Sequence, residues 1–240
     1  MAFNPADYTV PTAKPLPVIF LLDVSGSMYG SKILALNQAV EDMLQSFSAE
    51  NAMENEIRVS VITFGNQVKL HLPFTKADEI KWIALQADGG TPMGTALRMA
   101  KDMIEDKDVI PSRAYRPAVV LVSDGQPNDS WEKPLEDFIS SGRSAKCDRM
   151  ALAIGRDADE GVLGKFVQGT TNPLFHAENA AKLKDFFKFV TMSVTVRSKS
   201  RTPNSVPTPA DLGFDASKVA TNTQPKASES DSGDEEDGYW

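Results

Sequence analysis

The chain of 240 residues carries a formal net charge of −8 and has a pI near 4.9. This balance argues against nucleic acid as the main partner, because proteins that bind nucleic acid present a basic surface. Hydrophobic residues make up 41% of the chain and charged residues 24%, as in globular proteins, and the length suits one α/β domain.

Cellular location can also be predicted from composition. The single cysteine, Cys147, excludes an internal disulfide and is typical of a reducing compartment. Residues 1–15 lack the basic start and apolar core of a signal peptide. No apolar run approaches the roughly 20 residues that a membrane-spanning helix needs. We therefore expect a cytoplasmic monomer without a membrane or nucleic-acid partner.

Strand and helix patterns alternate from residue 16 to residue 196, after an N-terminal arm at residues 1–15. Short apolar runs predict strands, and apolar residues spaced three and four apart predict helices. The alternation predicts a doubly wound, mostly parallel sheet with helices on both faces. Strands are expected at 17–23, 57–64, 67–72, 117–123, 149–154 and 173–176, and helices at 31–49, 94–106, 131–141, 158–167 and 179–194.

One pair of strands breaks the parallel pattern. The runs Val59–Thr63 and Val68–Leu72 are separated by four residues that include Gly65-Asn66. Such a short connection with glycine and asparagine favours a β-hairpin. We therefore predict one antiparallel strand at the edge of the sheet.

The composition changes after Val196. Residues 197–240 contain four prolines, many serines and threonines, and few large apolar residues. Such a segment buries too little apolar surface to offset its conformational entropy, so a flexible tail is expected. An acidic run at residues 229–237 lies near its end.

Polar side chains follow the first strand of the predicted sheet. The run 17–22 is uniformly apolar, which indicates a strand buried on both faces, and Asp23, Ser25 and Ser27 come directly after it. Alternate side chains of extended backbone point to the same side, so one carboxylate and two hydroxyls converge there. Hard oxygen ligands of this kind suit Mg²⁺ or Mn²⁺.

Two other segments lead to the same edge of the sheet. Thr91 lies in the glycine-rich loop 88–94, and Asp124 follows the buried strand 118–123. Ligand sites of doubly wound sheets lie outside the carboxyl ends of the strands. The predicted metal ligands are Asp23, Ser25, Ser27, Thr91 and Asp124.

Each residue also has a structural interpretation. Asp23 could cap a helix or sit in a turn, Thr91 could be a helix N-cap, and Asp124 could belong to a turn. A Mg²⁺-dependent phosphatase with Asp23 as nucleophile is the alternative function. The haloacid-dehalogenase type needs a second aspartate two residues later, where Ser25 stands. We therefore predict a binding protein and no enzyme.

In order and spacing, these motifs resemble the metal-ion-dependent adhesion site of von Willebrand factor type A domains, over residues 16–196. The resemblance implies a six-stranded Rossmann-like sheet. It also implies that Ser25, Ser27 and Thr91 bind the metal, while Asp23 and Asp124 act directly or through water. A Glu or Asp of a partner protein then completes the octahedron. A carboxylate of the acidic tail, from the same or a neighbouring molecule, is an alternative ligand of the metal.

More narrowly, the motifs resemble the bacterial TerY-like branch, named for tellurite resistance. The supporting features are the Leu-Leu-Asp-Val-Ser-Gly-Ser-Met start and the Gly-Gly-Thr-Pro loop. This resemblance implies a protein kinase and a PP2C-type phosphatase as partners, in a stress-response or defence system. The sequence thus predicts a metal-dependent adaptor that captures an acidic side chain.

Overall fold

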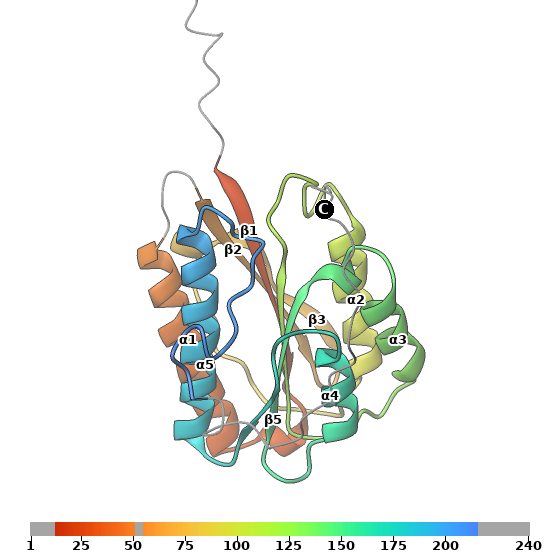
Figure 1. Ribbon diagram of the computed structural model, residues 1–240. Helices are drawn as coiled ribbons and strands as arrows, with labels where there is room; N and C mark the ends of the chain where they lie inside the picture. The colour runs from red at the N-terminus through yellow and green to blue at the C-terminus, as the bar shows by residue number, and fades with distance from the viewer. Residues whose placement is uncertain (1–12, 51–54, 216–240) are drawn as a thin grey trace, which may run out of the picture.

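The computed structural model describes residues 13–50 and 55–215, which form one mixed sheet between two layers of helices (Figure 1). The sheet has the strand order β3-β2-β1-β4-β5-β6, and only the β2–β3 pair is antiparallel. The strands are β1 (Lys14–Asp23), β2 (Asn55–Phe64), β3 (Val68–Lys76), β4 (Ala118–Ser123), β5 (Asp148–Ile154) and β6 (Leu174–Ala177). The helices are α1 (Ser31–Glu50), α2 (Met93–Glu105), α3 (Glu132–Ser140), α4 (Glu160–Val167) and α5 (Ala180–Lys199).

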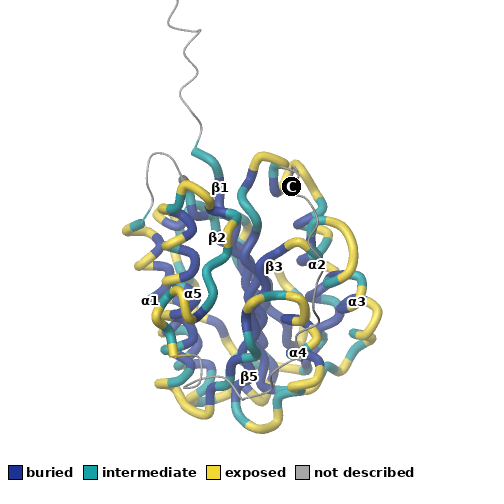
Figure 2. Tube along the Cα trace, in the orientation of Figure 1, coloured by how far each residue is buried: buried dark blue, intermediate teal, exposed yellow. Residues whose placement is uncertain are grey.

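Strand β1 is central, and its side chains supply both cores. Val18 and Phe20 pack into the core with α1 and α5, whereas Ile19 and Leu21 pack into the core with α2, α3 and α4. Figure 1 shows these two helical layers on opposite sides of the sheet, and Figure 2 shows the buried strands between them. The uniformly apolar run follows from this position, since each such side chain contributes about 1.5–3 kcal/mol when buried.

The register of β1 with its neighbours aligns the strand ends that matter for function. Leu22 lies opposite Val122 of β4, and Asp23 lies opposite Phe64 of β2. Strands β1 and β4 are parallel, so Asp23 and Ser123 end at the same edge of the sheet. The predicted hairpin with one antiparallel strand at the edge of the sheet is confirmed.

Strand β1 begins at Lys14, three residues before the predicted start, although it contains Pro15 and Pro17. The carbonyl of Pro15 accepts a hydrogen bond from Tyr115 N over 2.9 Å. The backbone polar groups of Pro15 therefore point toward the segment that leads into β4. Pairing with β4 starts only at Val18. The missing N–H groups of both prolines therefore fall where no ladder hydrogen bond is required.

The predicted domain end at Val196 is wrong, because α5 continues to Lys199 and the chain then packs against the domain. Phe214 contacts Phe189, with ring centroids 5.0 Å apart. The buried Arg197 donates from Nε to the carbonyl of Pro203 over 2.9 Å. At least residues 197–214 therefore differ from the predicted flexible tail. The acidic run at 229–237 lies outside the described residues.

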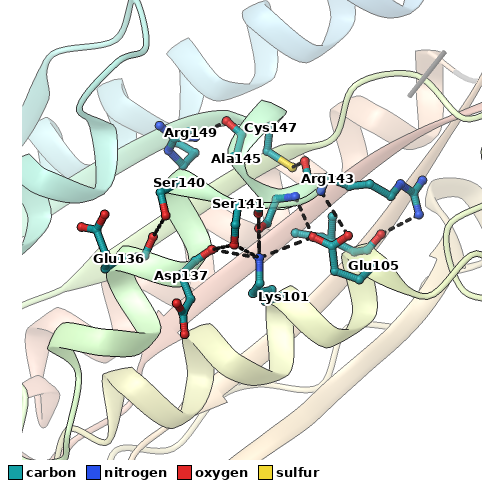
Figure 3. A network of polar contacts seen from close by, with 12 residues as sticks. Lys101, Glu105, Glu136, Asp137, Ser140, Ser141, Arg143, Ala145, Cys147 and Arg149 are labelled. Atoms are coloured by element: carbon teal, nitrogen blue, oxygen red, sulfur yellow. Dashed lines mark hydrogen bonds and ion pairs between the residues drawn. The ribbon is translucent and has the colours of Figure 1, made fainter. Parts of the chain in front are cut away.

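A polar network joins α2 to the segment between α3 and β5 (Figure 3). Lys101 donates to the carbonyl oxygens of Asp137 and Ser141 and to the hydroxyl of Ser144. Glu105 accepts the backbone N–H groups of Arg143 and Ser144. These contacts satisfy the end of α3 and position the start of β5. None of the described helices is long and apolar enough to cross a membrane.

Candidate metal centre

Three separate segments meet at the carboxyl end of β1, which is the lower end of the sheet in Figure 1. Gly26 N donates to the carbonyl of Gly89 over 2.9 Å, and Asp88 N donates to the carbonyl of Val24 over 2.7 Å. Asn128 N donates to the carbonyl of Thr91 over 3.0 Å. Backbone hydrogen bonds therefore fix the loop that carries Thr91 against the loops that follow β1 and β4.

Gly89 allows this close packing. Its φ of 80° lies in the left-handed region that favours glycine. A Cβ atom at this position would lie 2.3 Å from Cα of Asn66, which belongs to the β2–β3 turn. The loop can approach the hairpin to this distance only because residue 89 has no side chain.

A chain of hydrogen bonds connects four of the five predicted residues. The hydroxyls of Ser25 and Ser27 lie 2.9 Å apart, and Ser27 donates to Oδ1 of Asp124 over 2.7 Å. Oδ1 of Asp23 accepts from the backbone N–H of Ser25 over 2.8 Å. Its Oδ2 accepts from the hydroxyl of Ser123 over 2.6 Å. A hydroxyl that donates its hydrogen to a carboxylate still has lone pairs that can bind a cation.

Thr91 brings a further hydroxyl close to this group. A methyl group on Gly125 would lie 3.5 Å from the Thr91 hydroxyl and 3.7 Å from the Ser27 hydroxyl, so both hydroxyls lie close to Gly125. The N-cap interpretation of Thr91 is wrong, because the N-cap residue of α2 is Pro92 and the side chain that accepts the free N–H groups of the first turn is that of Asp129. Its carboxylate accepts the N–H groups of Gly94 and Thr95, each over 2.8 Å. We call Asp23, Ser25, Ser27, Thr91 and Asp124 the cup.

The electrostatics of the cup leave the carboxylate of Asp23 without a positive partner. Asp23 and Asp124 are both fully buried. Burial raises the pKa of Asp23 from 3.8 to about 6, and the negative charge of Asp124 adds to this, while hydrogen bonds from Ser123 and Ser25 oppose it. Within residues 13–50 and 55–215, no basic side chain forms an ion pair with Asp23.

The donor set therefore fits a hard divalent cation. It offers two carboxylates and three hydroxyls, and a cation would offset the cost of burying the charge of Asp23. In the described part of the chain, no three or more His, Cys, Asp or Glu side chains form a metal-binding group. Nitrogen and sulfur ligands of the kind that structural zinc prefers are absent from the cup itself.

Three residues at the site were not predicted. Ser123 positions Asp23, Asp129 caps α2, and Lys32 forms an ion pair of 2.5 Å with Oδ2 of Asp124. A signal for Lys32 exists in the sequence, because a lysine in the first turn of a helix opposes the helix dipole and calls for a negative partner.

The sequence model of the von Willebrand factor type A domain family matches residues 18–189 of the chain. The chain belongs to this family. As a von Willebrand factor type A domain, it has the six-stranded, mostly parallel sheet with one antiparallel strand that the strand and helix patterns predicted.

Individual proteins that match the chain have low sequence identity to it. The chain is 25% identical over 189 residues to inter-alpha-trypsin inhibitor heavy chain H6 of Homo sapiens, a match that covers 73% of this chain and 14% of that protein. The chain therefore corresponds to a small part of this relative.

Two solved structures share the fold. A von Willebrand factor type A protein from Catenulispora acidiphila is 21% identical with a TM-score of 0.58, covering 75% of this chain and 42% of that one. Proximal thread matrix protein 1 of the mussel byssus, solved with a zinc-occupied MIDAS motif, is 17% identical with a TM-score of 0.56. That match covers 76% of this chain and 46% of the mussel chain.

Proposed function

We propose that this von Willebrand factor type A domain is a metal-dependent protein-binding module that captures an acidic side chain of a partner protein. The observation that carries the proposal is Asp23, a fully buried carboxylate that sits beside Asp124 and has no basic partner in the described part of the chain. Mg²⁺ or Mn²⁺ is the expected cation, since all donors are oxygen atoms.

The residues of the cup have separate tasks in this proposal. Ser25, Ser27 and Thr91 would hold the cation through their hydroxyl oxygens. Asp23 and Asp124 would balance its charge, directly or through water, and Ser27 can keep its hydrogen bond to Asp124 while it does so. A bound divalent cation would supply a positive site with an open coordination position for a carboxylate.

The geometry favours binding over the alternative of a phosphatase with Asp23 as nucleophile. A nucleophile must reach its substrate, yet Asp23 is fully buried and each of its oxygens already accepts a hydrogen bond. The residue two positions later is Ser25, whose hydroxyl is a poor general acid at neutral pH.

The wider setting rests on the sequence resemblance to the TerY-like branch. A protein kinase and a PP2C-type phosphatase in a tellurite-resistance or stress response remain the proposed partners. Neither the inhibitor heavy chain nor the two solved structures is described as part of such a system. The zinc in the mussel protein is consistent with a divalent cation in this cup and does not identify the metal.

Calorimetric titration of the purified chain with MnCl₂ tests the proposal, followed by pull-downs from lysate in Mg²⁺ and in EDTA. Thr91→Ala keeps the charge of the cup and is expected to remove both metal binding and metal-dependent capture. Thr191→Ala is the matched control, because that hydroxyl donates to the Phe187 carbonyl on α5. Wild-type protein that binds no Mn²⁺ would refute the proposal.

A further inference from the structure

Lys32 lies at the edge of the cup. Its ammonium is 2.5 Å from Oδ2 of Asp124, whose Oδ1 accepts from Ser27, so the lysine and a proposed metal ligand contact opposite oxygens of one carboxylate. Among the described residues, Asp124 is the only hydrogen-bond partner of this ammonium. Since an ammonium has three donors, two remain for another acceptor.

The ammonium is also accessible. The side chain of Lys32 is 33% exposed, whereas Asp124 is fully buried. Gly155, in the loop after β5, has no side chain beside the ammonium, and a Cβ atom there would only reach van der Waals contact with Nζ, at 3.9 Å. An incoming carboxylate can therefore approach the ammonium from the solvent side.

The position of Lys32 on its helix conflicts with local preference. It is the second residue of α1, and a positive charge in the first turn of a helix is unfavourable because it faces the positive end of the helix dipole. The ion pair with Asp124 explains how the structure tolerates the charge. Residues that violate local rules commonly do so for function.

The charges show what Lys32 would change. Asp23 and Asp124, when ionised, and the ammonium of Lys32 leave the metal-free cup with one net negative charge. A divalent cation gives the loaded cup one net positive charge, whereas a cup without Lys32 would be neutral. Lys32 therefore opposes binding of the cation and favours binding of an anion to the loaded cup.

We infer that Lys32 is a second recognition point for the acidic side chain of the partner. One oxygen of that carboxylate occupies the open metal position, and the other accepts a hydrogen bond from the Lys32 ammonium. This inference rests on the proposed function of the cup. It assigns the preference for a carboxylate over a neutral oxygen ligand to Lys32.

The test uses the sign of two effects. Lys32→Met is expected to bind Mn²⁺ about 3- to 30-fold more tightly in calorimetry, because a nearby positive charge is removed. The same variant, loaded with Mn²⁺, is expected to bind acetate at least about 3-fold more weakly, because one charge-assisted hydrogen bond is lost. Acetate binding is measured from the paramagnetic relaxation of ¹³C-labelled acetate.

Two further variants make the result specific. Lys184→Met removes one positive charge from an exposed pair with Asp42 between α5 and α1, and it should change neither affinity. Lys32→Arg should retain most of the acetate affinity. If Lys32→Met does not fold, as judged by its thermal unfolding, Lys32→Gln takes its place.

Two results would overturn the inference while leaving the proposed function intact: weaker Mn²⁺ binding by the Lys32 variant, or unchanged acetate affinity. Absence of Mn²⁺ binding to the wild-type chain is a different result. It would overturn the proposed function, and the role of Lys32 would fall with it.

Discussion

Ser123, the last residue of β4, donates its hydroxyl hydrogen to Oδ2 of Asp23, the last residue of β1, over 2.6 Å. Both side chains are fully buried. This bond crosses between two adjacent parallel strands and fixes one carboxylate oxygen, while Ser25 N fixes the other. Asp23 is therefore held in one orientation before any ligand arrives.

The Ser123 hydrogen bond lowers the pKa of Asp23 and so opposes the effect of burial. Ser123→Ala should raise this pKa above about 6. Asp23 is then protonated in a larger fraction of the molecules, and each of these must release a proton before it binds a cation. We expect about 10-fold weaker Mn²⁺ binding at pH 6 and a smaller loss at pH 8. Ser60→Ala, at a buried serine of β2, is the control. A loss that is equal at both pH values would contradict this role.

The raised pKa of Asp23 also predicts how the metal-free protein responds to pH. Between the ordinary value of 3.8 and about 6, the folded state binds more protons than the unfolded state. Stability therefore falls as pH rises through this window, and the penalty is complete above about 6. Asp23→Asn should stabilise the EDTA-treated protein by about 1–3 kcal/mol at pH 8 and by little at pH 4.

Urea unfolding in EDTA at both pH values measures this effect. Addition of Mn²⁺ should then stabilise the wild-type protein and leave the Asp23→Asn variant unchanged, because only a protein that binds the ligand gains stability from it. An Asp23→Asn variant that is less stable than wild type at pH 8 in EDTA would count against the burial argument.

A comparison of two glycines with similar φ angles distinguishes the cost of backbone strain from the cost of a steric clash. Gly89 has φ 80° and Gly30 has φ 84°, but only a Cβ atom on Gly89 would meet the backbone of Asn66. Gly30→Ala should cost about 1 kcal/mol, the usual effect of a left-handed alanine. Gly89→Ala should cost at least about 2 kcal/mol more and weaken Mn²⁺ binding, since the Thr91 loop must move. Equal losses in chemical denaturation would show that the close approach is unimportant.

Much of the fold could be predicted, because the sequence patterns that mark its strands and the polar residues at their ends are local. The run 17–22 identified the central strand, and the alternation of Asp23, Ser25 and Ser27 placed three side chains at its end. The bounds of β2, β4, β5 and β6 differ from prediction by one or two residues, since periodicity defines an element better than its ends. That these side chains bind a metal remains a prediction.

What could not be predicted depends on partners distant in the chain. Lys32 contacts a carboxylate 92 residues away, and Ser123 contacts one 100 residues away. The segment after Val196 was predicted to be flexible from its composition. Its packing relies on two isolated apolar residues, Leu212 and Phe214, which leave no periodic signal.

The buried ion pair at the opposite end of the sheet links this segment to the domain. Arg197 lies 3.4 Å from Asp148 and also donates to the carbonyl oxygens of Pro203 and Arg116. Arg197→Met should cost about 3–5 kcal/mol, because it leaves the buried Asp148 with its hydrogen bond from Asn172 but without its ion-pair partner. The double variant Arg197→Met/Asp148→Leu should recover part of this loss.

Chemical denaturation of the single and double variants measures the coupling. Lys199→Met, which removes one partner of an exposed pair with Glu50, should cost less than about 1 kcal/mol. A similar small loss for Arg197→Met would show that residues 200–215 are not held by this arginine.

Cys147 should be inert in the folded protein. Burial raises the pKa of its thiol to about 12, and its sulfur contacts the carbonyl of Arg143 within the network of Figure 3. Iodoacetamide at pH 8 should label the native protein far more slowly than the urea-unfolded protein, because the thiolate is the reactive form. Equal labelling rates, followed by mass spectrometry, would contradict the buried position.

We propose that Asp23, Ser25, Ser27, Thr91 and Asp124 together form one divalent-metal site. A crystal grown in MnCl₂, with anomalous difference density, locates the metal directly. We expect one strong peak within about 2.5 Å of the hydroxyl oxygens of Ser25, Ser27 and Thr91. Fully loaded crystals without a peak in the cup, or with manganese bound only elsewhere, would contradict the claim.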